Sequence, residues 1–283
     1  MKEFNIYAFA DEASPMIDGQ IKAMKENGVK GLEIRNVDNI NISDITNEKA
    51  KEVRKKLDDA GLTVWSIGSP IGKIDIEKDD FEAHTEKFKH TLEIAYILGA
   101  GNIRLFSFYI PQGKKTDEFE DEVIDRLGKF TDIAAGSGID LCHENEKGIY
   151  GAMAAECLTI LKALPSLKGI FDPANFVQCG QDTLEAWSLL KPYIKYMHIK
   201  DARKNGSVVP AGEGAGNVRA IVSDFLANGG RDFTIEPHLA VFDGLSALER
   251  KDEKSNVGDF VYESNEQAFA AAVSAFRKIA EEV

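Results

Sequence analysis

The alternation of short β-type runs with amphipathic stretches, repeated eight times, restricts the fold of this chain more than any other feature. After each run comes a stretch in which apolar residues recur at helical spacing, as Ile17, Ile21 and Met24 do. Two further sets with this spacing are Phe88, Leu92, Ala95 and Tyr96, and Phe119, Val123, Leu127 and Phe130. Eight units in 283 residues give about 35 residues per unit, which suits a strand–helix unit of a barrel. The predicted strands span residues 4–9, 31–35, 63–67, 102–107, 139–144, 168–171, 195–200 and 232–236.

Glycines just ahead of five of these strands support the division into units. Each one stands where a helix must end in a left-handed residue before the chain enters the next strand. These glycines are Gly28, Gly61, Gly99, Gly138 and Gly229. With no linker rich in Pro, Ser or Gly, the pattern predicts an α/β protein with one domain over residues 1–283, a single (β/α)8 TIM barrel. A charged stretch near 240–264 is expected to be a loop insertion after the eighth strand.

Two other arrangements compete with this interpretation. An open doubly wound sheet usually has a glycine fingerprint after its first strand, but here Ala10, Asp11 and Glu12 follow that strand. The glycine-rich segment 212–217 matches no phosphate-loop pattern and is expected to be an active-site loop. A phosphate-binding role stays open for it, because the loop after the seventh strand often binds phosphate in barrels.

Composition disfavours several classes of protein. The chain has 34 Lys and Arg against 47 Asp and Glu, a net charge of −13, which disfavours a nucleic-acid partner. Its three cysteines include no C-x-x-C pair, so neither a disulfide framework nor a thiolate zinc site is expected. No secretory signal or membrane-length apolar run is visible. We therefore expect a cytoplasmic protein with no membrane partner.

Polar side chains gather at the carboxyl ends of the predicted strands, where a barrel carries its active site. Four of them come from four successive strands and have the chemistry of a metal site. They are Glu144, Asp172, His198 and Glu236. Carboxylates with one imidazole suit Mn²⁺, Mg²⁺, Co²⁺ or Zn²⁺. Because no local motif joins the four, this hypothesis depends on the barrel.

Other residues at strand ends are candidates for substrate binding. Glu33 and Arg35 share one face of the second strand, and either contact a substrate or form a buried ion pair. Lys200 lies two residues beyond His198 on the same face, so it can reach substrate oxygens. The remaining candidates of this kind are Arg104, Glu146 and His238. Alternation directs His143 away from the barrel interior, toward the helices.

Four of the strand-end runs resemble the xylose-isomerase-like TIM-barrel superfamily, which contains sugar isomerases, ketose 3-epimerases and type IV apurinic endonucleases. The runs are Leu-Cys-His-Glu-Asn-Glu-Lys-Gly at 141–148, Phe-Asp-Pro-Ala-Asn-Phe at 171–176, Met-His-Ile-Lys-Asp at 197–201 and Thr-Ile-Glu-Pro-His at 234–238. The resemblance implies one divalent metal ion, with Mn²⁺ expected first, held by Glu144, Asp172, His198 and Glu236. It also implies a small sugar substrate and a homodimer.

In the epimerase branch, the first and last of the metal-binding glutamates also serve as the acid/base pair. By resemblance, Glu144 and Glu236 are then catalytic residues that exchange a proton on opposite faces of the carbon next to a carbonyl. The metal would stabilise the enediolate. The resemblance therefore implies a metal-dependent sugar isomerase or epimerase, an enzyme of carbohydrate metabolism.

The chain departs from the epimerase pattern at two places. It has Asn175, a further substrate-binding candidate, where epimerases commonly have a histidine, and only Arg203 or Lys204 near the place of their arginine. A metal-dependent lyase that cleaves 3-oxo-glycosides by β-elimination is therefore an alternative, since it needs the same proton abstraction. An apurinic-type endonuclease is less expected, because it needs more histidine ligands than this chain offers. A metal-free binding barrel is the third alternative.

Overall fold

Eight parallel strands close into a barrel in the structure, a computed structural model that describes residues 3–242 and 262–283. Around the ring the strands follow sequence order, and the first pairs with the last through Asn5 and Asp232 to Ala8 and Ile235. The strands are β1 (Asn5–Ala8), β2 (Gly31–Ile34), β5 (Thr63–Ile67), β6 (Asn102–Leu105), β7 (Asp140–Glu144), β8 (Lys168–Phe171), β9 (Ile194–Ile199) and β12 (Asp232–Ile235). The prediction of a (β/α)8 barrel is confirmed, and every predicted strand matches an observed one.

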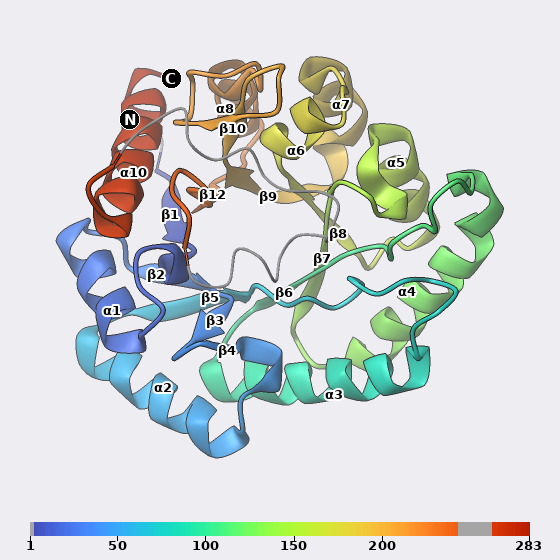
Figure 1. Ribbon diagram of the computed structural model, residues 1–283, viewed down its shortest axis with the longest axis horizontal. Helices are drawn as coiled ribbons and strands as arrows, with labels where there is room; N and C mark the ends of the chain where they lie inside the picture. The colour runs from blue at the N-terminus through green and yellow to red at the C-terminus, as the bar shows by residue number, and fades with distance from the viewer. Residues whose placement is uncertain (1–2, 243–261) are drawn as a thin grey trace.

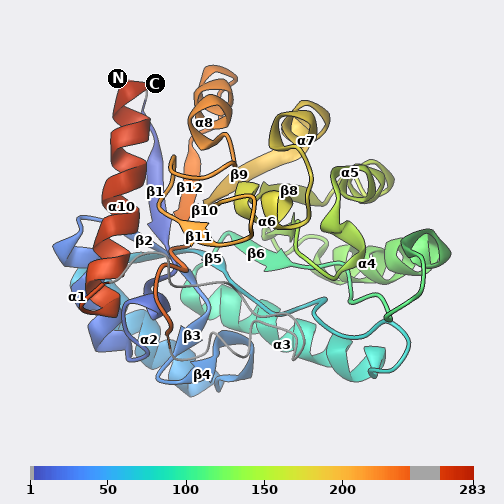
Figure 2. The ribbon, with the colours of Figure 1, turned by 45° about the horizontal axis from the view of Figure 1, so that its top comes forward.

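A ring of helices surrounds the strands (Figure 1). In chain order they are α1 (Ile17–Glu26), α2 (Asn47–Ala60), α3 (Phe81–Leu98), α4 (Glu120–Ala134), α5 (Ala154–Ala163), α7 (Thr183–Leu190), α8 (Val218–Ala227) and α10 (Asn265–Glu282). A short extra helix, α6 (Pro173–Gln178), follows β8. Two small hairpins extend the loops: β3 (Asn36–Val37) with β4 (Ile40–Asn41), and β10 (Asp201–Ala202) with β11 (Val208–Val209) (Figure 2).

Local sequence explains where the helices begin and end. Thr46 caps α2 by accepting a hydrogen bond from the N–H of Lys49, and Asp80 caps α3 in the same way. The five glycines predicted to end helices all have positive φ, for example 70° at Gly61, directly after α2. Short loops of this kind let each helix return the chain to the amino-terminal end of the next strand.

The apolar core lies between the strands and the helices. The predicted spacing on α4 is confirmed, because Val123, Leu127 and Phe130 are all fully buried. On α3, Phe88 is buried, but the expectation that Tyr96 continues this face is wrong, since its side chain is 81% exposed. Tyr96 is eight residues beyond Phe88, which at about 100° per residue turns its side chain about 80° away from that of Phe88. The buried stripe of α3 continues through other positions, such as Ala95 and Leu98.

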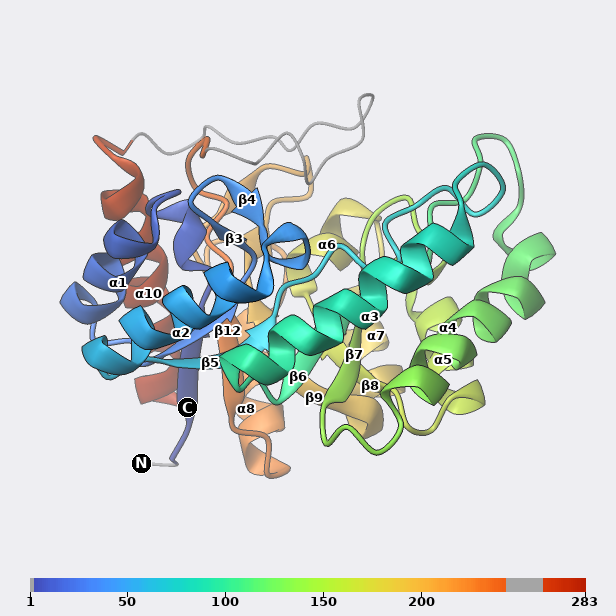
Figure 3. The same ribbon diagram turned by 90° about the horizontal axis from the view of Figure 1, so that it is seen from below.

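The two ends of the barrel differ in what they carry. Figure 3 shows the start of β1 and the carboxyl end of α10 at the end opposite the β3–β4 hairpin. The hairpin end is the one at which the strands finish, so the predicted site residues belong there. The loop insertion predicted near 240–264 falls mostly on residues 243–261, which lie outside the described residues. In the part of the chain that the structure describes, no helix has the length and apolar character to cross a membrane.

Candidate metal centre and active site

The four predicted metal ligands meet at the mouth of the barrel. Glu144 ends β7, Asp172 follows β8, His198 lies near the end of β9, and Glu236 follows β12. Each is at most 3% exposed, and each offers one ligand atom within 4.8 Å of the other three. The closed order of the strands produces this meeting, because residues at matching heights on neighbouring parallel strands point into one interior.

The chemistry of this donor set fits a divalent cation. Asp172 Oδ2 is buried, and among the described residues none donates a hydrogen bond to it. The ammonium of Lys200 lies 3.1 Å away, yet burial and the neighbouring carboxylates of Glu236 and Glu144 raise the pKa of Asp172 to about 7. A carboxylate whose charge is so poorly compensated gains from a cation bound beside it. Three carboxylates and one imidazole are ligands that Mn²⁺, Mg²⁺ or Zn²⁺ accept.

Each of the two predicted catalytic glutamates is held by its own buried arginine. Arg104 Nη1 lies 3.2 Å from Glu144 Oε2, and Arg35 Nη1 lies 3.2 Å from Glu236 Oε1. Lys200 Nζ donates to the other oxygen of Glu236 at 2.9 Å. Burial opposes ionisation of both glutamates, but these cations and His198 hold the pKa of each below its usual value. Both carboxylates are therefore ionised and fixed in orientation.

Arg35 is anchored from several sides at once. Its guanidinium binds both oxygens of Asp11, at 2.8 and 3.1 Å, and lies 3.1 Å from Glu12. The same group lies over the rings of Phe9 and Phe242, 4.6 and 5.1 Å from their centroids. Sequence reasoning placed Asp11 and Glu12 at a strand end but did not assign them to the site. Their position directly after the first strand was the available signal.

Glu33 lies below the metal centre, on the side away from the mouth. Its Oε2 is 3.1 Å from His198 Nε2, and its Oε1 accepts hydrogen bonds from Tyr196 and Ser66 at 3.0 and 3.3 Å. Burial opposes the charge of both groups, but their attraction lowers the pKa of Glu33 and raises that of His198. The alternative ion pair of Glu33 with Arg35 is absent from the ion pairs of the described residues, which join Arg35 to Asp11, Glu12 and Glu236 instead.

The other predicted substrate residues lie around this centre at different depths. Asn175 contacts one of the proposed ligands directly, since its amide donates to Glu144 Oε1 at 3.3 Å and to the carbonyl of Asn145 at 2.9 Å. Glu146 lies further out and pairs with Lys73 at 2.9 Å. The structure thus brings Asn175 against the proposed ligands and leaves Glu146 at the partly exposed rim.

His238 also lies close to Glu236. Its Nε2 lies 3.4 Å from Glu12 and 3.7 Å from Glu236, and no residue in the described ranges forms a hydrogen bond with this nitrogen. Its backbone has φ of 44°, a conformation that non-glycine residues seldom adopt, and its N–H donates to Glu12 at 2.6 Å. The ring stacks on Phe242 at 5.7 Å. His238 therefore offers a free polar atom next to a predicted catalytic carboxylate.

The remaining histidines lie outside the barrel interior. His143 points into the helix layer, as alternation predicts, where its Nε2 lies 3.0 Å from the hydroxyl of Ser107. His84 accepts a hydrogen bond from the N–H of Gly72, and His90 contacts the carbonyl of Ile45. All five histidines of the chain are within the described residues, and only His198 and His238 reach the mouth.

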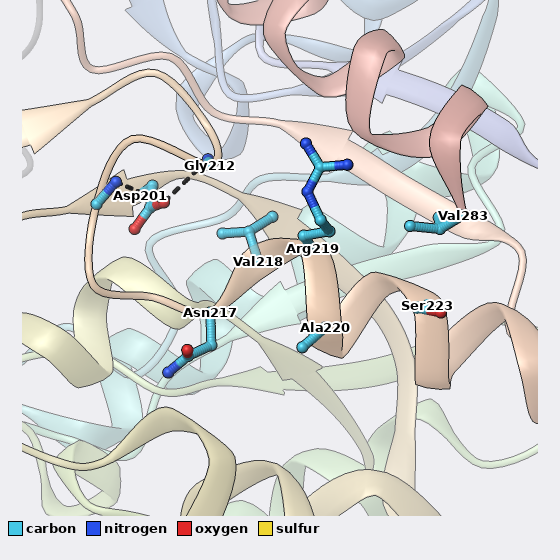
Figure 4. Close-up of a pocket in the computed structure, with 9 residues that line it drawn as sticks. Asp201, Gly212, Asn217, Val218, Arg219, Ala220, Ser223 and Val283 are labelled. Atoms are coloured by element: carbon cyan, nitrogen blue, oxygen red, sulfur yellow. Dashed lines mark hydrogen bonds between the residues drawn. The ribbon is translucent and has the colours of Figure 1, made fainter.

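The glycine-rich segment 212–217 is organised by one aspartate. Asp201 accepts hydrogen bonds from the N–H groups of Gly212, Gly214 and Gly216 at 2.9–3.0 Å, beside a pocket of about 520 Å³ between α8 and the end of α10 (Figure 4). Since these amides already bind a carboxylate, they are not free to bind a phosphate. The structure therefore favours the prediction of a loop over that of a phosphate-binding segment.

Comparison with known proteins agrees with this architecture. The model of the xylose isomerase-like TIM barrel family matches residues 21–251. The chain belongs to this family. No curated protein matches the chain in sequence.

Solved structures share the fold at low sequence identity. An L-ribulose 3-epimerase has a TM-score of 0.74 and 18% identity, with 100% of this chain and 95% of that chain covered. The IOLI protein with a bound zinc atom has a TM-score of 0.74 and 15% identity over 98% of each chain. A 3-keto-D-glucoside 4-epimerase, YcjR from E. coli, has a TM-score of 0.69 and 17% identity over 98% of this chain and 99% of that one. These likenesses show the shared barrel.

Proposed function

We propose that the protein is a divalent-metal-dependent enzyme that isomerises or epimerises a sugar by moving a proton next to a carbonyl group. The observation that carries this proposal is the meeting of four buried ligand atoms, all within 4.8 Å of one another, at the mouth of the barrel. Glu144, Asp172, His198 and Glu236 would hold the metal. When bound, the metal would polarise the oxygens of the substrate and stabilise negative charge on them.

The two glutamates supply the acid and the base. Glu144 and Glu236 stand on strands separated by β8 and β9, so they approach the space between them from two sides. Inversion at a carbon needs one group to remove a proton and another to deliver one to the opposite face, which two fixed carboxylates can do. Arg104 and Arg35 keep the carboxylates in place. Asn175, Lys200 and His238 lie within reach of the same space and would bind substrate hydroxyls.

The metal and the substrate class extend this proposal. Mn²⁺ is our first choice, and the zinc in the related IOLI structure supports a divalent ion in this kind of barrel. Two of the structural relatives are epimerases of sugars or 3-keto sugars by name, which supports a sugar substrate. A cytoplasmic location stays a prediction from the cysteine usage of the sequence. A homodimer stays a prediction that sedimentation velocity would check.

The test is uptake of solvent deuterium. The purified protein, loaded with Mn²⁺, is incubated in D₂O with a panel of ketoses, 3-keto sugars and their glycosides, and the sugars are analysed by NMR. We expect deuterium at a single carbon with at least one sugar, and its loss with Glu236→Gln. Glu120→Gln is the matched control, because it removes a carboxylate that binds Tyr150 outside the metal centre and should leave exchange unchanged. Absence of uptake with every sugar would contradict the proposal.

A lyase that cleaves 3-oxo-glycosides is the second candidate. Asn175 favours it over a standard ketose epimerase, because this amide contacts Glu144 where epimerases commonly have a histidine. The same incubation separates the two, since a lyase releases the aglycone and an epimerase does not. An apurinic-type endonuclease is disfavoured, because only His198 and His238 of the five histidines reach the mouth.

A further inference from the structure

The fully buried carboxylate of Glu33 has no part in the proposed proton transfer. It lies at the centre of a closed set of contacts, with His198 on one oxygen and Tyr196 and Ser66 on the other. Glu33, Tyr196, Ser66 and His198 are all 0% exposed. Burying a carboxylate away from water costs free energy unless other groups stabilise its charge. A buried carboxylate that takes no part in the reaction therefore calls for another function.

The imidazole of His198 separates Glu33 from the metal centre. Nδ1 of this ring faces Glu144 and Glu236, at 2.9 and 3.7 Å, whereas Nε2 faces Glu33 at 3.1 Å. A neutral imidazole has a proton on one nitrogen and a lone pair on the other, and the acceptor beside one nitrogen decides which. Both nitrogens face a carboxylate, so the ring can donate a hydrogen bond on each side while no cation is bound. A cation held by Glu144 and Glu236 would take the place of the Nδ1 proton, and Glu33 would then keep the remaining proton on Nε2 and direct the lone pair of Nδ1 toward the metal centre.

We infer that Glu33 is a positioning residue, which holds His198 in the tautomer and ring orientation that let Nδ1 bind the metal, and that it does not contact the substrate. Tyr196 and Ser66 hold Glu33 in turn, because their hydroxyls donate hydrogen bonds to its other carboxylate oxygen. Carboxylates that orient metal-binding histidines in this way commonly contribute 10- to 100-fold, roughly, to metal affinity. The inference rests on the metal site of the proposed function.

Metal titration of two variants tests the inference. Dissociation constants are measured for Co²⁺ by visible absorption and for Mn²⁺ by competition with an indicator, without any substrate. Glu33→Gln removes the charge at nearly constant shape and is expected to weaken binding about 10-fold or more, and to change the Co²⁺ spectrum. Glu120→Gln is the matched control, because it makes the same change at a carboxylate that accepts a hydrogen bond from Tyr150 at 2.9 Å and lies outside the metal centre, and it should change affinity less than about threefold.

A second measurement does not depend on any variant. In ¹⁵N-labelled wild-type protein loaded with Zn²⁺, the ring nitrogens of His198 report the tautomer, and we expect the proton on Nε2 and the metal on Nδ1. Metal on Nε2 would overturn the inference, and this result does not depend on whether Glu33→Gln folds. Thermal unfolding of the metal-free variant shows whether Glu33→Gln is folded.

The outcomes separate this inference from the proposed function. If the wild-type protein binds neither Co²⁺ nor Mn²⁺, the metal site itself is wrong and both ideas fail. If it binds them and Glu33→Gln binds them equally well, only the positioning role fails. An increase in KM for the sugar with unchanged metal affinity would likewise overturn it, because that result belongs to a substrate-binding residue.

Discussion

Two buried histidines, one in the barrel interior and one in the helix layer, have pKa values shifted in opposite directions. His198, in the barrel interior, lies between the carboxylates of Glu33 and Glu144, and although burial disfavours its charged form, these neighbours raise its pKa well above the usual value. His84, in the helix layer, lies 6.2 Å from the ring of Phe130, and there burial lowers its pKa to about 4. Burial alone therefore says little about function. The neighbours decide whether a charge is stabilised.

The barrel mouth and the helix layer also differ in the kind of contacts that fill them. In the interior at the mouth, acids and cations form a connected set in which Arg35, Arg104 and Lys200 each contact a proposed metal-binding or catalytic residue. In the layer between strands and helices, the contacts are mainly between aromatic and aliphatic side chains, such as Phe88 and Phe130 at 4.8 Å. A set of buried charges contributes little net stability. We therefore expect function and stability to respond to different substitutions.

The largest effect is expected from a change in the charged interior. Asp172→Asn keeps the shape and the Oδ1 acceptor that caps α6, but removes a metal-binding charge. The rate of deuterium exchange should fall about a thousandfold or more, since metal assistance supplies several kcal/mol. The free energy of unfolding of the metal-free protein should equal or exceed that of wild type, because the lost charge is poorly compensated. Unfolding in urea and exchange by NMR check both results. A marked loss of unfolding free energy would contradict the expectation that the charged interior contributes little to stability.

A change in the helix layer should lower the stability of the protein and leave its metal affinity unchanged. Phe130→Ala removes a fully buried ring that contacts Phe81, Phe88 and Phe108, and should cost about 3–5 kcal/mol of unfolding free energy. Affinity for Mn²⁺ should stay within about twofold of wild type below the unfolding temperature, because the mouth does not touch this ring. Calorimetry and metal titration measure the two quantities. A large loss of metal affinity in folded protein would show that the regions are coupled.

The smallest effect is a dependence of stability on pH that arises from His84. The unfolded histidine binds a proton below about pH 6.5, whereas in the folded protein it does so only below about pH 4. Its contribution is therefore complete above pH 6.5 and is lost as pH falls toward 4, by up to about 3 kcal/mol. His84→Gln keeps an acceptor for the N–H of Gly72 and cannot titrate, so its stability should fall less over this range. Equal slopes in the two proteins would assign the acid sensitivity to other groups.

Most of the fold could be predicted because its signals are local. Strand runs, helical spacing and the glycines that end helices each depend on a few neighbouring residues, and the structure agrees with them closely. The meeting of Glu144, Asp172, His198 and Glu236 followed from the fold, since successive strand ends of a closed barrel share one mouth. Tyr96 was misplaced because spacing alone does not fix the width of a buried face.

The sequence by itself determined which strand ends carry acids, cations and imidazoles, because alternation within a strand fixes the side to which each residue points. Only the tertiary structure decided which of these groups pair: Arg35 with Glu236, Arg104 with Glu144, and Glu33 with His198, over separations of 40 to 201 residues. The physical reason is that an ion pair depends on distance in space, and barrel closure, register and rotamer set those distances together.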